Sequence, residues 1–488
     1  MPLEKPGEDF RVPFTKSFRV ILMSWFEYTW PFLVITGVYI LVFSLISPRY
    51  EVPQNDDWAY YLTVQQWFQT GKLSHLGWND PTLLFQLIWG GLFSWLFGVS
   101  YTSLRLSTLV LSWLGVVSLY GILRRLTQGR AVSLLGAGVL LLNPVYLCLS
   151  YSYNTDIPYV GLATAATLSL LWALDKKSTV GFLACGVLTA CAFLVRQQGI
   201  ILPLVGSAYL LFEQWHRYGA YPRRSRTLIA ILCLWLPVLL ALGLHAHWLQ
   251  SATDGTWSPR WSNLHPFFSA PSVGGFVDLL VQSLHATVGL LLSFGILLIP
   301  LFVALWPTGK APLRRRRVLQ WVLYGSILLF AILSAVLAQQ QEIGMRGWPY
   351  GGNYLGRFGP LEPIEGGSRW LPLGVTLSAT LIAPVCSALV VVACLRVFLE
   401  WNGDPVKRKQ VLVLALGMAQ LLPVFALKTA YDRYFLVALP AVVAAVICWS
   451  PVRRGGLIAG FICLCLLGGV SLEWTRATSD RTRARWEV

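Results

Sequence analysis

Charged residues are scarce in this sequence. Asp, Glu, Lys and Arg together make up 12% of the 488 residues, whereas 56% are hydrophobic and the mean hydropathy is +0.60. The surface of an ordinary soluble domain requires about twice that fraction of charge. The composition therefore excludes a soluble globular protein and indicates a polytopic membrane protein.

Long polar stretches are also missing, so the sequence offers no segment for a separate soluble domain. Apolar runs recur from residue 30 to residue 471, and roughly 20 apolar residues suffice to cross a bilayer. The first run is too long for a signal peptide and lacks a small-residue cleavage site, so we expect a retained span. We expect one all-α membrane domain over residues 1–488, with about 12–13 transmembrane helices. The expected spans are 30–47, 101–122, 131–149, 157–174, 179–195, 199–213, 227–249, 277–306, 318–338, 372–398, 411–427, 434–450 and 456–471.

Cysteine and histidine do not form metal-binding patterns. All nine cysteines lie within or at the edges of apolar runs, where they act as small packing residues rather than as a disulfide framework. The side chains of His245 and His247 would diverge on a helix, and His265 has no partner at a suitable spacing. We therefore expect no metal and no cofactor, and leave only a divalent cation open.

The formal net charge of +16 comes largely from short basic clusters between the apolar runs. None is interleaved with a soluble recognition element, which argues against nucleic-acid binding. Such clusters mark cytoplasmic loops. They all face the cytoplasm if residues 82–98 lie along the membrane, and residues 48–100 then form an outer loop. The C-terminal arginines would face outward against this rule, so whether the last span crosses completely stays open. The clusters are at 124–130, 217–226, 314–317, 407–409 and 453–454.

Ionisable residues gather on the predicted outer face. Asp56 and Asp57 follow the first span, and Asp156, Arg196 and Arg433 each stand at the end of a later span. Each acid could simply cap a helix, and each arginine could reach for the membrane interface. Charges at membrane depth are costly, however, and usually line a polar cavity or site. Their shared position on one face therefore favours a functional site.

The segment "NDDWAYYLTVQQWFQTGKL" resembles the first outer loop of the GT-C glycosyltransferases related to dolichyl-phosphate-mannose protein mannosyltransferases and bacterial aminoarabinose transferase. "NPVYLCLSYSYNTDIPY", "FLVRQQGIILP" and "DRYFLVALP" resemble later segments of that family. The resemblance covers roughly residues 1–215, the most family-like module, and then 428–440. The first loop of the family has an acidic pair, a Tyr four positions after the first acid, and a helix ending in Phe-Gly. Here these positions are Asp56, Asp57, Tyr60, Phe97 and Gly98.

The resemblance implies an inverting glycosyltransferase that takes a sugar from a polyprenyl phosphate. This chemistry needs a base for the acceptor hydroxyl and groups that stabilise the departing phosphate. The resemblance makes Asp56 the expected base, with Asp57 and Asp156 positioning the acceptor or sharing its acid-base environment. The residues expected to hold the donor phosphate are Arg196, Arg433, Lys428 and Arg357, and those expected to contact substrate are Tyr60, Gln197 and Tyr431.

Two segments are harder to interpret. Aminoarabinose transferase has a Lys, thought to contact the donor phosphate, where this chain has Asp80 before Pro81, and a carboxylate cannot hold a phosphate. The phosphate site must then be built from other residues. The outer loop 339–371 is rich in glycine and aromatic residues, which suits a lid over a sugar and its acceptor. A loosely packed connector fits the same composition equally well.

The sequence therefore predicts sugar transfer on the outer face of the membrane, most simply a bacterial plasma membrane, to a lipid, glycan or protein acceptor. A transporter or flippase of a lipid-linked or polar substrate is the main alternative, since scattered intramembrane charges are expected there too. The sequence shows no inverted repeat with interrupted helices, which would favour a transporter. A non-catalytic assembly subunit that keeps the fold is a third possibility.

Overall fold

The computed structural model describes most of the chain, and the description below is confined to these residues. They are 14–54, 56–74, 82–127, 129–218, 224–252, 268, 270–305, 320–321, 323–329, 355–356, 359–363, 373–401, 404–427, 431–449 and 452–486.

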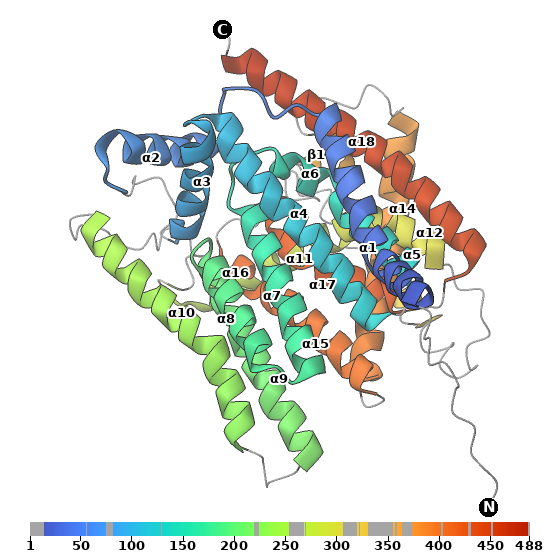
Figure 1. Cartoon of the computed structure of the whole chain (residues 1–488). Helices are drawn as coiled ribbons and strands as arrows, with labels where there is room; N and C mark the ends of the chain where they lie inside the picture. Colours follow the sequence, from blue (N-terminus) through green and yellow to red (C-terminus); the bar gives the residue numbers. More distant parts are fainter. Residues whose placement is uncertain are drawn as a thin grey trace, which may run out of the picture.

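The described residues form an almost entirely helical bundle (Figure 1). One short antiparallel hairpin, β1 (Leu355–Gly356) with β2 (Gly359–Pro363), is the exception within these ranges. The helices in chain order are α1 (Phe14–Leu45), α2 (Asp57–Thr70), α3 (Leu84–Phe97), α4 (Tyr101–Leu126), α5 (Arg130–Leu141), α6 (Pro144–Ser150), α7 (Asp156–Lys176), α8 (Thr179–Phe193), η1 (Gln197–Ile200), α9 (Ile201–Tyr218), α10 (Arg224–Ala252), α11 (Val273–Leu297), α12 (Ile299–Leu305), α14 (Leu373–Leu399), α15 (Pro405–Ala419), α16 (Leu422–Phe425), η4 (Asp432–Val437), α17 (Leu439–Ile447) and α18 (Arg454–Trp486).

Seven helices in the described ranges are long and apolar enough to cross a membrane, and α5 with α6 makes an eighth if the bent pair is one span. This confirms an all-α polytopic membrane protein. The predicted number of 12–13 spans is not reached in these ranges, because several apolar runs fold as short or broken helices. The run 179–195 gives only the 15 residues of α8, and 434–450 is divided between η4 and α17. Most of the expected span 318–338 lies outside the described residues.

Two local features show how sequence shapes the bundle. Asn143 breaks the run 131–149, because its side-chain oxygen accepts hydrogen bonds from the N–H groups of Val145 and Tyr146 and starts a new helix at Pro144. The two helices meet at an angle of 63°. Gly161 lets α7 approach α4 closely, since a Cβ there would lie 2.2 Å from the backbone oxygen of Leu111. This close contact helps to set the position of α7 along α4, and therefore the position of Asp156 at the start of α7.

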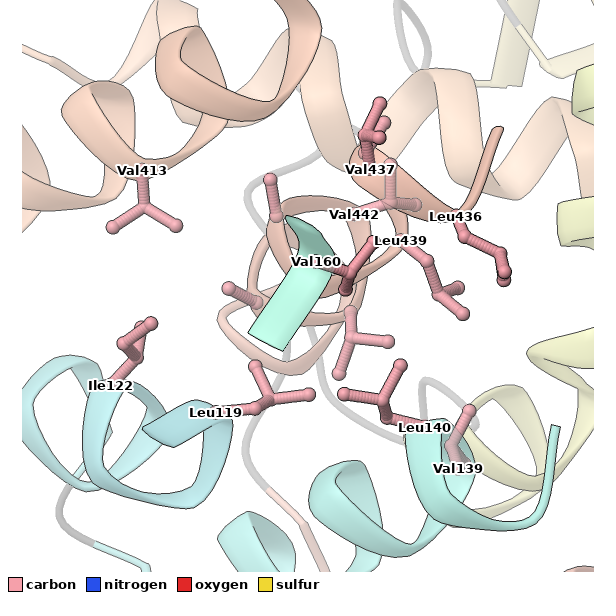
Figure 2. Close-up of a cluster of buried hydrophobic side chains, with 14 of the residues drawn as sticks. Leu119, Ile122, Val139, Leu140, Val160, Val413, Leu436, Val437, Leu439 and Val442 are labelled. Atoms are coloured by element: carbon pink, nitrogen blue, oxygen red, sulfur yellow. The ribbon is translucent and has the colours of Figure 1, made fainter. Parts of the chain in front are cut away.

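The hydrophobic core joins segments that lie far apart in the sequence (Figure 2). Leu119 of α4, Leu140 of α5 and Val160 of α7 are buried together with Leu439 and its neighbours from the C-terminal third. Burial of each such side chain contributes about 1.5–3 kcal/mol. The segment formed by η4 and α17 is thereby held against α7, which brings residues near 433 to the start of α7.

The two ends of α7 each carry an acid, but in different surroundings. Asp156 stands at its first residue, whereas Asp175 near its last turn forms ion pairs with Arg125 and Lys409. The 21 residues of α7 span about 30 Å, the thickness of a bilayer core. The basic clusters at 124–130 and 407–409 therefore lie across the bundle from Asp156, as the predicted topology requires.

The last helix runs the full height of the bundle. α18 has 33 residues, about 50 Å of helix. Near its C-terminal end, Arg476 donates to the carbonyl of Leu45, where α1 ends, and the guanidinium of Arg483 lies 5.1 Å from the ring centre of Tyr50. The C-terminal arginines are therefore on the same side as the loop after α1. α18 is also long and apolar enough to cross a membrane, and whether it does so completely stays open.

The helix predicted to lie along the membrane, residues 82–98, is α3. It has 14 residues, about 21 Å, and is shorter than the roughly 30 Å of a bilayer core. Such a length suits a helix that does not cross. Its orientation to the membrane plane stays a prediction, as do the division into modules and the lid 339–371, of which only the backbone of β1 and β2 is described.

Candidate active site

The loop after α1 is held by a buried arginine. Arg105 of α4 has no exposed surface and donates to the carbonyls of Tyr50 and Val52, the latter at 2.6 Å. Its guanidinium lies 3.6 Å from the ring centre of Tyr50. Its Nη2 lies 3.7 Å from the carboxylate of Asp57, which is also fully buried. These contacts fix the backbone that leads into α2.

Asp57 points into the protein rather than toward a substrate. Its carboxylate accepts the N–H of Gln54 at 2.6 Å and that of Tyr153 at 3.4 Å. Burial raises the pKa of Asp57 to about 7, against the opposing effects of Arg105 and of these two hydrogen bonds. The contribution of Asp57 to catalysis stays a prediction, and its contacts hold the backbone next to Asp56.

Asp56 faces the other way. It occupies the N-cap position of α2, yet its side chain accepts no capping hydrogen bond from the helix. Its carboxylate is instead 3.2 Å from Nη2 of Arg433, from η4. The capping explanation for Asp56 therefore does not describe its side chain.

Asp156 and Arg196 complete an alternating row of charges. Arg196 Nη2 donates to Asp156 Oδ1 at 2.8 Å, and Nε of Arg433 lies 4.0 Å from Asp156 Oδ2. The order is Asp56, Arg433, Asp156, Arg196, with formal charges that sum to zero. The residues come from the loop after α1, from η4, from the start of α7 and from the turn before η1. The structure thus brings together the four residues for which the sequence predicted convergence.

Two further residues support the row. Thr155 accepts a hydrogen bond from Arg196 Nε at 2.9 Å. The ring of Tyr434 lies between the two arginines, with guanidinium carbons 5.4 Å (Arg196) and 5.5 Å (Arg433) from its centre. Both distances are within the range of cation–π attraction. These contacts orient the guanidinium groups, and Arg196 is not a side chain that simply reaches for the interface.

The four side chains differ in exposure. Asp56 has 31% of its side-chain surface exposed, against 14% for Arg196, 10% for Arg433 and 3% for Asp156. Asp56 is therefore the more exposed of the two carboxylates in the row.

The other predicted residues are distributed more widely. Tyr60 is buried on α2 and packs edge-on against Tyr153, so it supports the loop. Tyr431 lies beside the site, 5.6 Å from the guanidinium carbon of Arg433, and Gln197 is exposed in η1 next to Arg196. Two predicted residues, Lys428 and Arg357, lie outside the described residues and stay predictions, and Asp80, where the sequence departs from the family, lies outside them too.

Sequence reasoning missed Arg105, Thr155 and Tyr434. Arg105 had a usable signal, because a single arginine in the apolar run 101–122 must find a partner inside the protein. Thr155 and Tyr434 had none, since each is adjacent to a predicted residue and matters only through three-dimensional contact.

Comparison with protein families matches residues 80–241 to the dolichyl-phosphate-mannose-protein mannosyltransferase family. This confirms the resemblance seen in the sequence. The matched segment contains Asp156, Arg196 and Arg105, but neither Asp56 nor Arg433. A search of the curated proteins found no match.

Solved structures with similar architecture include the archaeal oligosaccharyltransferase AglB from Archaeoglobus fulgidus, in complex with an inhibitory peptide and a dolichol-phosphate. It has a TM-score of 0.47 and 13% identity, and the alignment covers 94% of this chain but only 56% of AglB. ArnT from Cupriavidus metallidurans, bound to undecaprenyl phosphate, has a TM-score of 0.39 and 16% identity over 91% of this chain and 78% of ArnT. The arabinosyltransferase EmbB from Mycobacterium smegmatis has a TM-score of 0.37 and 13% identity over 94% of this chain and 43% of EmbB.

The chain is thus an all-α integral membrane protein that resembles the GT-C glycosyltransferases, with the family match on the segment that carries Asp156 and Arg196.

Proposed function

We propose that this protein is an inverting glycosyltransferase. It takes a sugar from a polyprenyl-phosphate donor and transfers it, on the outer face of a bacterial plasma membrane, to a lipid, glycan or protein acceptor. The observation that carries the proposal is the charge row itself, in which two arginines that suit a phosphate stand beside one exposed carboxylate that suits an acceptor hydroxyl.

The roles follow from exposure and contact. Asp56 is the base because it is the most exposed acid of the row. Asp156 lies between both arginines and holds them in place, with one oxygen on Arg196 and the other facing Arg433. Guanidinium groups bind phosphate in a bidentate manner and keep their charge at any physiological pH.

Binding of the donor phosphate frees Asp56, the base, from its ion pair with Arg433. Arg433 is paired with Asp56 at 3.2 Å, so a phosphate that binds Arg433 competes directly with that carboxylate. Once freed, Asp56 takes the proton of the acceptor hydroxyl as the acceptor oxygen forms a bond to the anomeric carbon. The bond from that carbon to the phosphate oxygen breaks on the opposite face, and the departing phosphate keeps the electron pair beside the arginines. Configuration at the anomeric carbon therefore inverts.

The test is Asp56→Asn in the purified, full-length protein, assayed with a panel of polyprenyl-phosphate sugars. The amide keeps the shape of the carboxylate but cannot take a proton, so turnover falls by about 10²–10⁴-fold while donor binding persists. Asp278→Asn is the matched control, because Asp278 is an exposed acid on α11 that is not a member of the row. Full transfer activity in Asp56→Asn would remove Asp56 from the mechanism.

A second variant separates donor binding from chemistry. Arg433→Ala should weaken donor binding by roughly tenfold to a hundredfold, since a charge-assisted hydrogen bond is lost. Transport of a lipid-linked sugar across proteoliposomes, without any transfer product and unaffected by Asp56→Asn, would instead support the transporter alternative.

A further inference from the structure

A groove of about 600 Å³ opens at the end of the bundle opposite to the charge row. Its volume is in the range of small-molecule sites. It lies between α1, α4, α7 and α8. Its lining residues are Phe32, Leu114, Ser118, Tyr120, Gly121, Arg124, Arg125, Arg130, Ala165, Leu168, Ser169, Trp172 and Leu188.

The groove has two chemically distinct parts. Its wall is largely apolar and follows α4 from Leu114 to Arg124, a rise of about 15 Å. Its mouth carries Arg124, Arg125 and Arg130, at the last turn of α4 and the first residue of α5. An apolar wall that ends in three arginines, at the end of helices long enough to span a membrane, suits a lipid with its chain along the wall and its headgroup at the mouth.

The positive charge at the mouth of the groove favours a negatively charged lipid headgroup. The described residues that line the groove include three arginines and no acid. The nearby carboxylate of Asp175 is shared between Arg125 and Lys409, so it offsets only part of the positive charge around it. The lining of the mouth is therefore positive, which favours a negatively charged phosphate over a zwitterionic headgroup.

We propose that this groove binds one anionic phospholipid from the leaflet on the side of the basic clusters. The site is separate from the charge row and independent of the proposed sugar transfer. The arginines at 124–130 then have a role beyond topology, because they hold the lipid phosphate while its chain fills the space between α4 and α7. Each arginine contributes about fivefold to the affinity for the anionic lipid.

The experiment uses the full-length protein, delipidated in neutral detergent, with phosphatidylglycerol and phosphatidylcholine added as separate probes and retention followed by native mass spectrometry. The wild-type protein should retain one phosphatidylglycerol in preference to phosphatidylcholine. Arg124→Gln combined with Arg130→Gln should weaken phosphatidylglycerol binding by about 25-fold and leave phosphatidylcholine unchanged. Arg454→Gln is the matched control, since Arg454 is exposed on α18 and outside the groove.

Thermal unfolding separates lost binding from lost folding. Phosphatidylglycerol should raise the melting temperature of the wild-type protein and of Arg454→Gln, each relative to its own value without lipid, but should not raise that of the double variant. Equal retention of the two lipids by the wild-type protein, or undiminished phosphatidylglycerol binding in the double variant, overturns the proposal. Displacement of phosphatidylglycerol by undecaprenyl phosphate at equal concentration would also overturn it, and would assign the groove to the polyprenyl lipid.

Discussion

Breaking the pair of Arg105 and Asp57 should cost both stability and activity. Arg105→Met removes the charge but keeps an unbranched apolar side chain in a site with no solvent exposure. The carboxylate of Asp57 is then left buried without its cation, and the carbonyls of Tyr50 and Val52 lose their donor. Loss of one member of a buried ion pair costs about 3–5 kcal/mol of unfolding free energy. Most of this cost should be seen as a lower melting temperature in detergent.

The double variant distinguishes a charge effect from a packing effect. Asp57→Asn together with Arg105→Met leaves no unpaired buried charge, so it should be more stable than Arg105→Met alone, with a coupling free energy of roughly 0.5–3 kcal/mol. Sugar transfer should fall in both variants because the loop that carries Asp56 loses its anchor. Donor binding should change less, since Arg196 keeps its contacts with Asp156 and Thr155.

Two results would refute this reasoning. One is a melting temperature of Arg105→Met equal to that of the wild-type protein, which would mean that the buried charge of Asp57 is neutralised without Arg105. The other is unchanged transfer in a clearly destabilised variant, which would mean that Arg105 stabilises the fold without positioning Asp56.

Three further predictions concern pH, packing and topology. The pKa of Asp57 is raised to about 7 in the folded protein, so the folded state holds one more proton than the unfolded state between about pH 4 and pH 7. The free energy of unfolding should therefore fall as pH rises from about 4 through 7, by at most about 1.4 kcal/mol per pH unit. Asp57→Asn should flatten this dependence of the melting temperature on pH. Gly161→Ala should lower the free energy of unfolding by about 1–3 kcal/mol, because the added Cβ would meet the carbonyl of Leu111. Gly243→Ala is the control, since the space around Gly243 is open. An equal melting temperature for the two variants would contradict the α4–α7 contact. In a cysteine-free background, cysteines at Gln65 and Thr127 should be labelled from opposite sides of the membrane, and labelling of both from outside would contradict the topology.

The sequence was most informative about local structure and about sidedness. The bounds of α2 follow local sequence signals, because the helix begins at the acidic pair and ends at Thr70, with Gly71 as its C-cap at φ 72°. Helix ends are predictable because capping residues and glycine act over a few positions. The convergence of Asp56, Asp156 and the two arginines followed from counting which loops share a face, and that count depends only on charge and hydropathy.

The number of spans in the described residues and the inward orientation of Asp57 were not predictable for a related reason. Hydropathy measures how apolar a run is, but an apolar run surrounded by other helices can fold as short segments, as 434–450 does in η4 and α17. Likewise, Asp56 and Asp57 are equivalent in any local pattern. Which of them turns inward depends on Arg105, some 50 residues away on α4.

Under the proposed function, the balance of charge in the row bears on how a base and a phosphate share one site. The two carboxylates and two guanidinium groups of the row have formal charges that sum to zero before substrate binds. A donor phosphate adds negative charge and must therefore displace a carboxylate from an arginine. Asp156 is 3% exposed and paired with Arg196, whereas Asp56 is 31% exposed and paired with Arg433. Asp56 is therefore the carboxylate that a phosphate displaces more easily. Under the proposed function, the acid that the donor releases is the acid nearest to the acceptor, so the base becomes available only when a sugar is present to be transferred.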